Sequence, residues 1–166
     1  MANRYQSNDL ILFIEALFVA AGMDADKSAI VAPLLVEADL MGHTTHGIAQ
    51  APAYLSGLEK GLVKGTGDPL VVKDRGAVTT WDGQRISGVW LTAKAIDLAV
   101  ERSKKYGTAT IAIRRSGHIA CLAAFLSRAT EKGCMIELAS SDPSIVSVAP
   151  YGGTKPAFTP NPIAMG

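Results

Sequence analysis

Residues 77–113 read AVTTWDGQRISGVWLTAKAIDLAVERSKKYGTATIAI, and the order of patterns in this stretch decides the fold class. Residues 77–82 form a short segment that favours a strand, residues 89–106 have the period of an amphipathic helix, and residues 108–113 alternate like a strand again. A strand, a helix and a strand in this order predict a crossover unit whose helix packs against the sheet. We therefore expect an α/β protein.

The strand and helix patterns continue on both sides of this stretch. Residues 70–74 precede it as a strand, while residues 119–132 follow it as a helix and residues 135–139 as another strand. Residues 163–165 have the pattern of a further strand at the very end of the chain. An apolar end is unusual because natural termini are generally polar and exposed. We therefore expect a chain that is cut short.

The first sixty residues carry helical patterns instead. Helices are expected at residues 7–21, 24–41 and 51–60, with Ser7 and Asp24 as the capping residues of the first two. A loop rich in Gly and Pro follows. The predicted fold is thus an amino-terminal helical segment, residues 1–66, followed by residues 67–166, a mixed sheet with crossover helices that is incomplete at its carboxyl end.

Composition excludes several classes of protein. The 166 residues include 16 basic and 15 acidic side chains, and this balance argues against nucleic acid as a partner. A hydrophobic fraction of 48% argues against a disordered or fibrous chain. The most apolar stretch, residues 10–23, is too short to span a membrane, and the start lacks the pattern of a signal peptide. Cys121 and Cys134 fit no metal or redox spacing, which favours free thiols in the cytoplasm.

Two of the three histidines lie in one loop between predicted helices. Residues 42–47 read GHTTHG, so hydroxyl and imidazole side chains are held between two rigid supports. Such groups can donate hydrogen bonds to an anionic or carbonyl oxygen. They can equally serve as helix caps beside a histidine that faces solvent, because Thr before a helix is most often a cap.

The third histidine, His118, follows one predicted strand, and Asp142 follows the next. Ligand sites in open α/β sheets lie at the carboxyl ends of strands, so we expect both side chains at one sheet edge if the strands are parallel neighbours. A carboxylate beside an imidazole suits a general acid or base. Asp142 also precedes a proline, which is common in ordinary turns. Because no G-x-G-x-x-G or P-loop motif is present, a standard Rossmann fold is not expected.

Several motifs in a fixed order resemble the malate/L-lactate dehydrogenase family. They are GHTTHG at 42–47, YL at 54–55, DG at 82–83, His118, SDP at 141–143, APYGG at 149–153 and NPIA at 161–164. The resemblance implies a fold other than the Rossmann fold, NAD or NADP as cofactor, and a homodimer. It implies interconversion of a 2-hydroxy acid and a 2-oxo acid, or reduction of a cyclic imino acid. Family members have about twice this length, so the chain is expected to be their amino-terminal half, with residues 1–66 on the substrate side.

The resemblance also implies a role for individual residues. Three side chains are expected to be catalytic, with either histidine as the proton donor: His46, His118 and Asp142. Ser141 is expected to contact the cofactor. Four residues are expected to bind the substrate: Thr45, Gln50, Tyr54 and Asn161.

Two positions depart from the family pattern. Gln50 stands where the family usually has an arginine that clamps the substrate carboxylate, and Pro160 stands where a threonine is common. Glutamine has neither the charge nor the two-pronged geometry of arginine. Arg114 or Arg115 could take over the clamp. The identity of the substrate therefore stays open.

Two other functions use the same residues. A metal-dependent hydrolase could take its ligands from His43, His46, His118 and Asp142, although the loop offers no nearby glutamate base. An inactive fragment with a role only in assembly is the other alternative. We expect the oxidoreductase, with a small acid as its substrate and no metal, nucleic acid or membrane as a partner.

Overall fold

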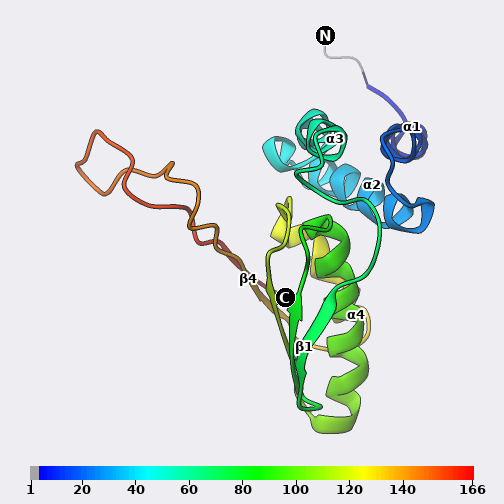
Figure 1. The fold of residues 1–166 in the computed structure, drawn as a ribbon, viewed down its shortest axis with the longest axis vertical. Coiled ribbons are helices and arrows are strands. Elements are labelled where there is room, and N and C mark those ends of the chain that lie inside the picture. Colours follow the sequence, from blue (N-terminus) through cyan, green and yellow to red (C-terminus); the bar gives the residue numbers. More distant parts are fainter. Residues whose placement is uncertain (1–3) are drawn as a thin grey trace.

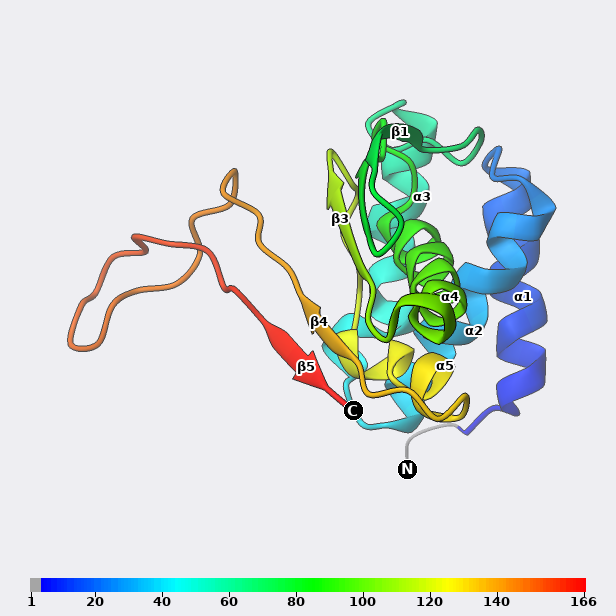
Figure 2. The same cartoon turned by 90° about the horizontal axis from the view of Figure 1, so that it is seen from below.

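The computed structural model describes residues 4–166, which form a helical end, a small sheet backed by one long helix, and a projecting ribbon (Figures 1 and 2). The helical end consists of α1 (Ser7–Ala20), α2 (Ala25–Leu40) and α3 (Ala51–Glu59), which lie close to the predicted positions. None of the helices in the described part of the chain is long and apolar enough to cross a membrane.

The predicted crossover unit is confirmed. Strand β2 (Val78–Asp82) pairs in parallel with β3 (Thr110–Arg114), and α4 (Gly88–Tyr106) connects them. Strand β1 (Leu70–Asp74) pairs antiparallel with β2, with a register shift between Val71 and Lys73. The sheet is therefore mixed, in the order β1-β2-β3.

The two strands that follow do not join this sheet. Strand β4 (Glu137–Ala139) pairs antiparallel with β5 (Ile163–Met165) as a separate ribbon, and the segment between them extends away from the body of the molecule (Figure 2). The expectation that the strands before His118 and Asp142 are parallel neighbours is therefore wrong.

The expectation of a single helix at residues 119–132 is also wrong. Ala120 has a positive φ of 54° and Cys121 is extended, so regular helix cannot begin at this point. The segment instead forms a 3-10 helix, η3 (Leu122–Phe125), and one short turn of helix, α5 (Ser127–Thr130). His118 consequently lies in an irregular loop after β3 and does not open a helix.

Neither expected cap forms through its side chain. Ser7 is the first residue of α1 rather than its cap, because Gln6 occupies the capping position. Asp24 does precede α2, but its carboxylate accepts a hydrogen bond from Lys27 Nζ at 2.9 Å and makes none to the helix backbone. The backbone positions of the helices were therefore easier to predict than the contacts at their ends.

One hydrophobic core joins the helical end to the sheet. Phe18 and Leu35 from the helices are fully buried with Val89 and Leu91 of α4 and with Phe125 of η3. The division into residues 1–66 and 67–166 thus remains a proposal, since the two segments share this core.

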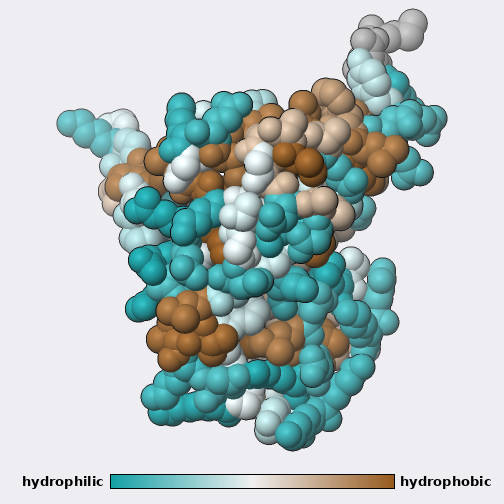
Figure 3. Space-filling model, turned by 45° about the vertical axis from the view of Figure 1, so that its right-hand side comes forward, coloured by the Kyte–Doolittle hydropathy of each residue, from teal (hydrophilic) through white to brown (hydrophobic). Residues whose placement is uncertain are grey.

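Apolar surface is still visible at the helical end and in a separate patch lower in the view (Figure 3).

Candidate active site

The histidine-containing loop is held by an acidic residue of α2. Asp39 Oδ2 accepts a hydrogen bond from the backbone N–H of Ile48 at 2.7 Å. A Cβ atom at Gly47 would clash with the Asp39 carboxylate, so a larger residue at this position would displace the side chain that binds Ile48. Sequence reasoning missed Asp39, although an acidic side chain at the end of a helix just before a glycine-containing loop is a signal that could have identified it.

Within this loop, two 3-10 turns orient His46. They are η1 (Thr44–His46) and η2 (Ile48–Gln50). Thr45 Oγ1 lies 2.9 Å from His46 Nδ1, at hydrogen-bond distance. Gln50 Nε2 donates to the Thr45 carbonyl oxygen at 2.7 Å, so its amide nitrogen holds the loop and is not directed at a ligand.

His118 is positioned by close backbone packing against the start of α4. A Cβ atom at Gly88 would overlap the carbonyl group of Gly117, and the Gly117 N–H donates to the Ile86 carbonyl oxygen at 3.1 Å. Two non-glycine residues beside His118, Arg115 and Ala120, have positive φ values of 52° and 54°. Such conformations are rare for residues with side chains and are maintained only by surrounding contacts.

Three side chains from distant parts of the sequence meet at this point. Tyr54 Oη of α3 lies 2.7 Å from His118 Nδ1, and the two ring centroids are 5.9 Å apart. The His46 and His118 ring centroids are 6.0 Å apart. Two of the predicted catalytic residues, His46 and His118, are therefore neighbours, together with the predicted substrate-binding residue Tyr54.

The electrostatic environment favours the neutral forms of Tyr54 and His118. Burial raises the pKa of the Tyr54 hydroxyl far above its ordinary value, so Tyr54 stays protonated. Partial removal from water lowers the pKa of His118; the nearby His46 lowers it further, and Asp142 opposes both effects. A neutral imidazole beside a protonated phenol can donate or accept hydrogen bonds without a large charge being buried.

Asp142 lies within electrostatic range of His118 but is not hydrogen-bonded to it. Its Oδ1 accepts hydrogen bonds from the Ser144 hydroxyl at 2.5 Å and from the Ser144 N–H at 3.0 Å. These bonds, and then the charge of His118, lower the pKa of Asp142. Within residues 4–166 the two side chains share no hydrogen bond, and the strands that precede them belong to different sheets, so their expected pairing stays a prediction.

The remaining predicted residues lie on the projecting segment. Ser141 and Asn161 are exposed near the two ends of the segment that joins β4 to β5. Asn161 Nδ2 donates to the Thr159 carbonyl oxygen at 3.3 Å. The contacts of Asn161 are thus local, and the cluster of His46, Tyr54 and His118 does not include it.

Both arginines considered as replacements for the missing clamp bind a buried aspartate. Arg115 makes a two-pronged pair with Asp82, with Nε–Oδ1 2.8 Å and Nη2–Oδ2 2.7 Å, and Arg114 Nε lies 3.1 Å from Oδ2. These contacts lower the pKa of Asp82 to about 2, chiefly through the hydrogen bond from Arg115. This ion pair joins the ends of β2 and β3, so both side chains have a structural role.

The arrangement does not favour the metal-dependent hydrolase. Within residues 4–166, no group of three or more His, Cys, Asp or Glu side chains is placed to hold a metal ion. His118 Nδ1 is occupied by Tyr54, and the Asp142 carboxylate is occupied by Ser144. One nitrogen of His118 and the carboxylate of Asp142 are therefore used in other contacts.

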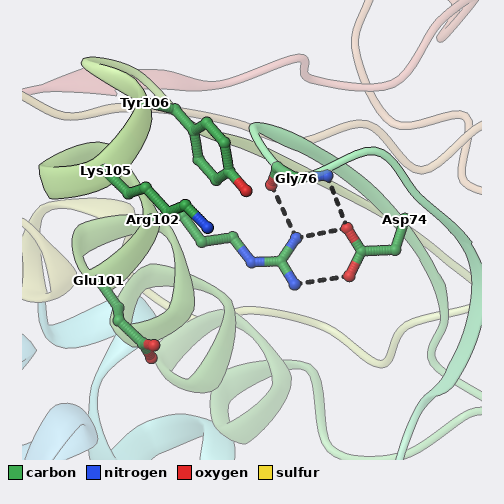
Figure 4. Close-up of a pocket in the computed structure, with 6 residues that line it drawn as sticks. All are labelled: Asp74, Gly76, Glu101, Arg102, Lys105 and Tyr106. Atoms are coloured by element: carbon green, nitrogen blue, oxygen red, sulfur yellow. Dashed lines mark hydrogen bonds and ion pairs between the residues drawn. The ribbon is translucent and has the colours of Figure 1, made fainter.

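An open hollow of about 410 Å³ lies away from the histidines, at the carboxyl end of α4 (Figure 4). Arg102 points into it and binds both Asp74 oxygens and the Gly76 carbonyl oxygen. Its donors are used in joining the β1–β2 turn to α4. This hollow is therefore explained by a structural ion pair, and the histidine cluster is the better candidate for catalysis.

Comparison with known proteins agrees with this fold. The sequence model for malate/L-lactate dehydrogenase matches residues 5–166, so the chain belongs to that family of oxidoreductases. It is 27% identical over 164 residues to L-sulfolactate dehydrogenase of Methanothermobacter thermautotrophicus, covering 98% of this chain and 47% of the relative. It is 31% identical over 157 residues to a pyrroline-2-carboxylate/piperideine-2-carboxylate reductase of Pseudomonas syringae, covering 95% and 45%.

The solved structures give the same result. The crystal structure of malate dehydrogenase from Entamoeba histolytica superposes with a TM-score of 0.89 at 25% identity, covering 100% of this chain and 46% of that one. The chain thus spans about half the length of the relatives it matches. The α/β fold expected from the sequence is confirmed.

Proposed function

We propose that these residues form part of the active site of an NAD- or NADP-dependent oxidoreductase that interconverts a 2-hydroxy acid and a 2-oxo acid, or reduces a cyclic imino acid. One observation carries the proposal: the side chains of His46, Tyr54 and His118 converge from η1, α3 and the loop after β3. Membership of a family of hydroxy-acid dehydrogenases and the names of its relatives support this reaction class.

The proposed role of the two imidazoles is to stabilise the charge on the reacting oxygen and to transfer its proton. Reduction of a carbonyl builds negative charge on oxygen, and hydrogen-bond donors aimed at that oxygen stabilise it. His46 and His118 are exposed, side by side, and each has Nε2 unused by the contacts described above. In the reverse direction an imidazole accepts the proton of the hydroxy acid. Asp142 acts on His118 through its charge.

The two imidazoles fit the reaction of a nicotinamide cofactor, because hydride transfer to a carbonyl carbon requires a proton donor for the carbonyl oxygen. When bound, the cofactor supplies or removes the hydride at carbon. The exposed imidazoles can hold the matching proton, and the exposed hydroxyl of Ser141 is the group proposed to contact the cofactor. The chain has no glycine-rich phosphate loop, so Ser141 alone cannot hold a dinucleotide.

The proposed substrate site consists of Thr45, Gln50 and Asn161, and Tyr54 lies beside it with its hydroxyl on His118. Gln50 can offer a ligand its amide oxygen more readily than its nitrogen, because the nitrogen binds Thr45. A substrate carboxylate therefore gains no charged clamp from Gln50, nor from the arginines that bind Asp82. This feature favours a substrate whose recognition depends on hydrogen bonds more than on a carboxylate–arginine pair.

We also propose a homodimer in the cytoplasm.

The test is turnover by the native polypeptide that contains these residues. Purified enzyme is mixed with NADH or NADPH and, in turn, pyruvate, oxaloacetate and piperideine-2-carboxylate, and oxidation of the cofactor is followed by absorbance. Turnover with at least one of these substrates, and its loss in His118→Ala but not in His43→Ala, is expected. Absence of turnover across a wide range of 2-oxo and cyclic imino acids would refute the proposal.

A further inference from the structure

The hydrogen bonds around His118 are unequal on its two ring nitrogens. Nδ1 lies 2.7 Å from Tyr54 Oη, and the backbone N–H of Ala120 donates to the same nitrogen at 3.3 Å. Nε2 makes no hydrogen bond to another group of residues 4–166. The two nitrogens of a neutral imidazole differ, one being a donor and the other an acceptor, so the partners of Nδ1 decide which is which.

Both partners of Nδ1 can act as donors. A backbone N–H can only donate, so the Ala120 N–H requires a lone pair on Nδ1. The Tyr54 hydroxyl can donate or accept, and it donates when Nδ1 carries no proton. A proton on Nδ1 would oppose the Ala120 N–H, so both contacts are hydrogen bonds only when Nδ1 is unprotonated.

We propose that Tyr54 is a positioning residue that, together with the Ala120 N–H, holds neutral His118 with its proton on Nε2. This inference rests on the proposed function for its catalytic consequence. The Nε2–H group then donates a hydrogen bond to the reacting oxygen of the substrate, and His118 acts as a neutral donor.

The backbone near His118 is built to hold the Ala120 N–H in this position. Ala120 has a φ of 54°, an uncommon conformation for a residue with a side chain, and it is buried. The tight contact between Gly88 and Gly117 fixes the other side of the loop. Tyr54 is held independently by α3 and by packing of its ring against Phe18, with centroids 6.5 Å apart. The donor geometry is thus set by two separate elements.

The first test is the tautomer of His118, measured by nitrogen NMR of polypeptide labelled at its histidines. With three histidines in the 166 residues, the signals can be assigned by single substitutions. In the wild-type protein, at a pH where His118 is neutral, Nδ1 is expected to give the signal of an unprotonated nitrogen that accepts a hydrogen bond. Tyr54→Phe removes one donor, so the share of the form protonated on Nδ1 should rise. Tyr106→Phe, at the far end of α4, is the matched control and should change nothing.

The wild-type spectrum can overturn the proposal by itself. If His118 is protonated mainly on Nδ1, the Tyr54 hydroxyl accepts instead of donating, and the inference is wrong even if Tyr54→Phe fails to fold. An unchanged spectrum in folded Tyr54→Phe would also overturn it. Because this readout needs no turnover, it separates the inference from the proposed function: an inactive polypeptide with the expected spectrum would refute only the latter.

The second test separates positioning from substrate binding by steady-state kinetics. Loss of one ordinary hydrogen bond that acts through His118 should lower kcat by about 10-fold in Tyr54→Phe and leave KM nearly unchanged. The ring is kept in this variant, so its packing against Phe18 is preserved. A rise in KM with unchanged kcat would instead assign the hydroxyl to the substrate and contradict the proposal.

Discussion

The loop that carries His118 and the projecting segment that carries Asp142 differ in how their polar groups are held. His118 receives hydrogen bonds from Tyr54, 64 residues earlier in the sequence, and its loop packs on the first residue of α4. Within residues 4–166 the Asp142 carboxylate is hydrogen-bonded only by Ser144, two residues away. Both residues follow strands, yet only the first is fixed by contacts from other parts of the fold. A polar residue after a strand is therefore preorganised only when another element packs against its loop.

The strongest test of this difference between His118 and Asp142 is to remove the His118 side chain. His118→Ala should lower kcat roughly 10²–10⁴-fold, because it removes a positioned donor from the reacting oxygen. Thermal stability should change little, since the side chain is exposed. Kinetics and thermal unfolding of the same preparation measure both effects, with His43→Ala as the control. Full activity in His118→Ala would remove this residue from the mechanism.

The backbone support of the His118 loop can be tested next. Gly88→Ala places a methyl group against the Gly117 carbonyl, and overpacking of this kind should lower the free energy of unfolding by about 1–3 kcal/mol. Gly57→Ala is the matched control, because its methyl group meets Val63 at an ordinary distance inside α3. That change should raise stability by roughly 0.5–1 kcal/mol. Denaturant unfolding measures both. Equal effects of the two substitutions would show that the loop does not depend on close backbone packing.

Asp142 provides the weaker side of the comparison. Asp142→Asn keeps the shape of the side chain and removes its charge, which acts on His118 without a direct hydrogen bond. The loss in kcat should therefore stay under about 10-fold, well below that of His118→Ala. A loss as large as that of His118→Ala would mean that the two side chains form a tight pair during the reaction.

The smallest expected effect is on the pH dependence of stability. The pKa of His118 in the folded chain lies below its ordinary value of 6.5, so the unfolded chain binds more protons just below pH 6.5. The contribution of neutral His118 is complete above about pH 6.5 and is lost as the pH falls. His118→Gln should therefore show a smaller decrease in Tm between about pH 7 and pH 5 than the wild-type protein. Parallel Tm curves would contradict the lowered pKa.

Some of the site could be predicted because it depends on local pattern. The loop at residues 42–47 lies between two helices whose periods are clear in the sequence, and His118 follows a strand with regular alternation. Tyr54 was expected at the site through family resemblance, but its hydroxyl contact was not. A hydrogen bond between residues so far apart leaves no periodic signal. The same reason explains why Asp39 and the Asp82–Arg115 pair were missed.

The sequence by itself determined the elements that local periodicity and turn residues specify: three helices, a crossover unit from β2 through α4 to β3, and an α/β class. Tertiary structure alone decided that β4 pairs with β5 and not with β3, because the local pattern of a strand does not specify which distant strand it pairs with. It also decided that residues 119–132 break into η3 and α5, since the close contact of Gly117 with Gly88 and the positive φ of Ala120 override helical propensity. The hydrogen bond between Tyr54 and His118 was also decided by tertiary structure, because it forms only when the core has packed α3 beside the loop after β3.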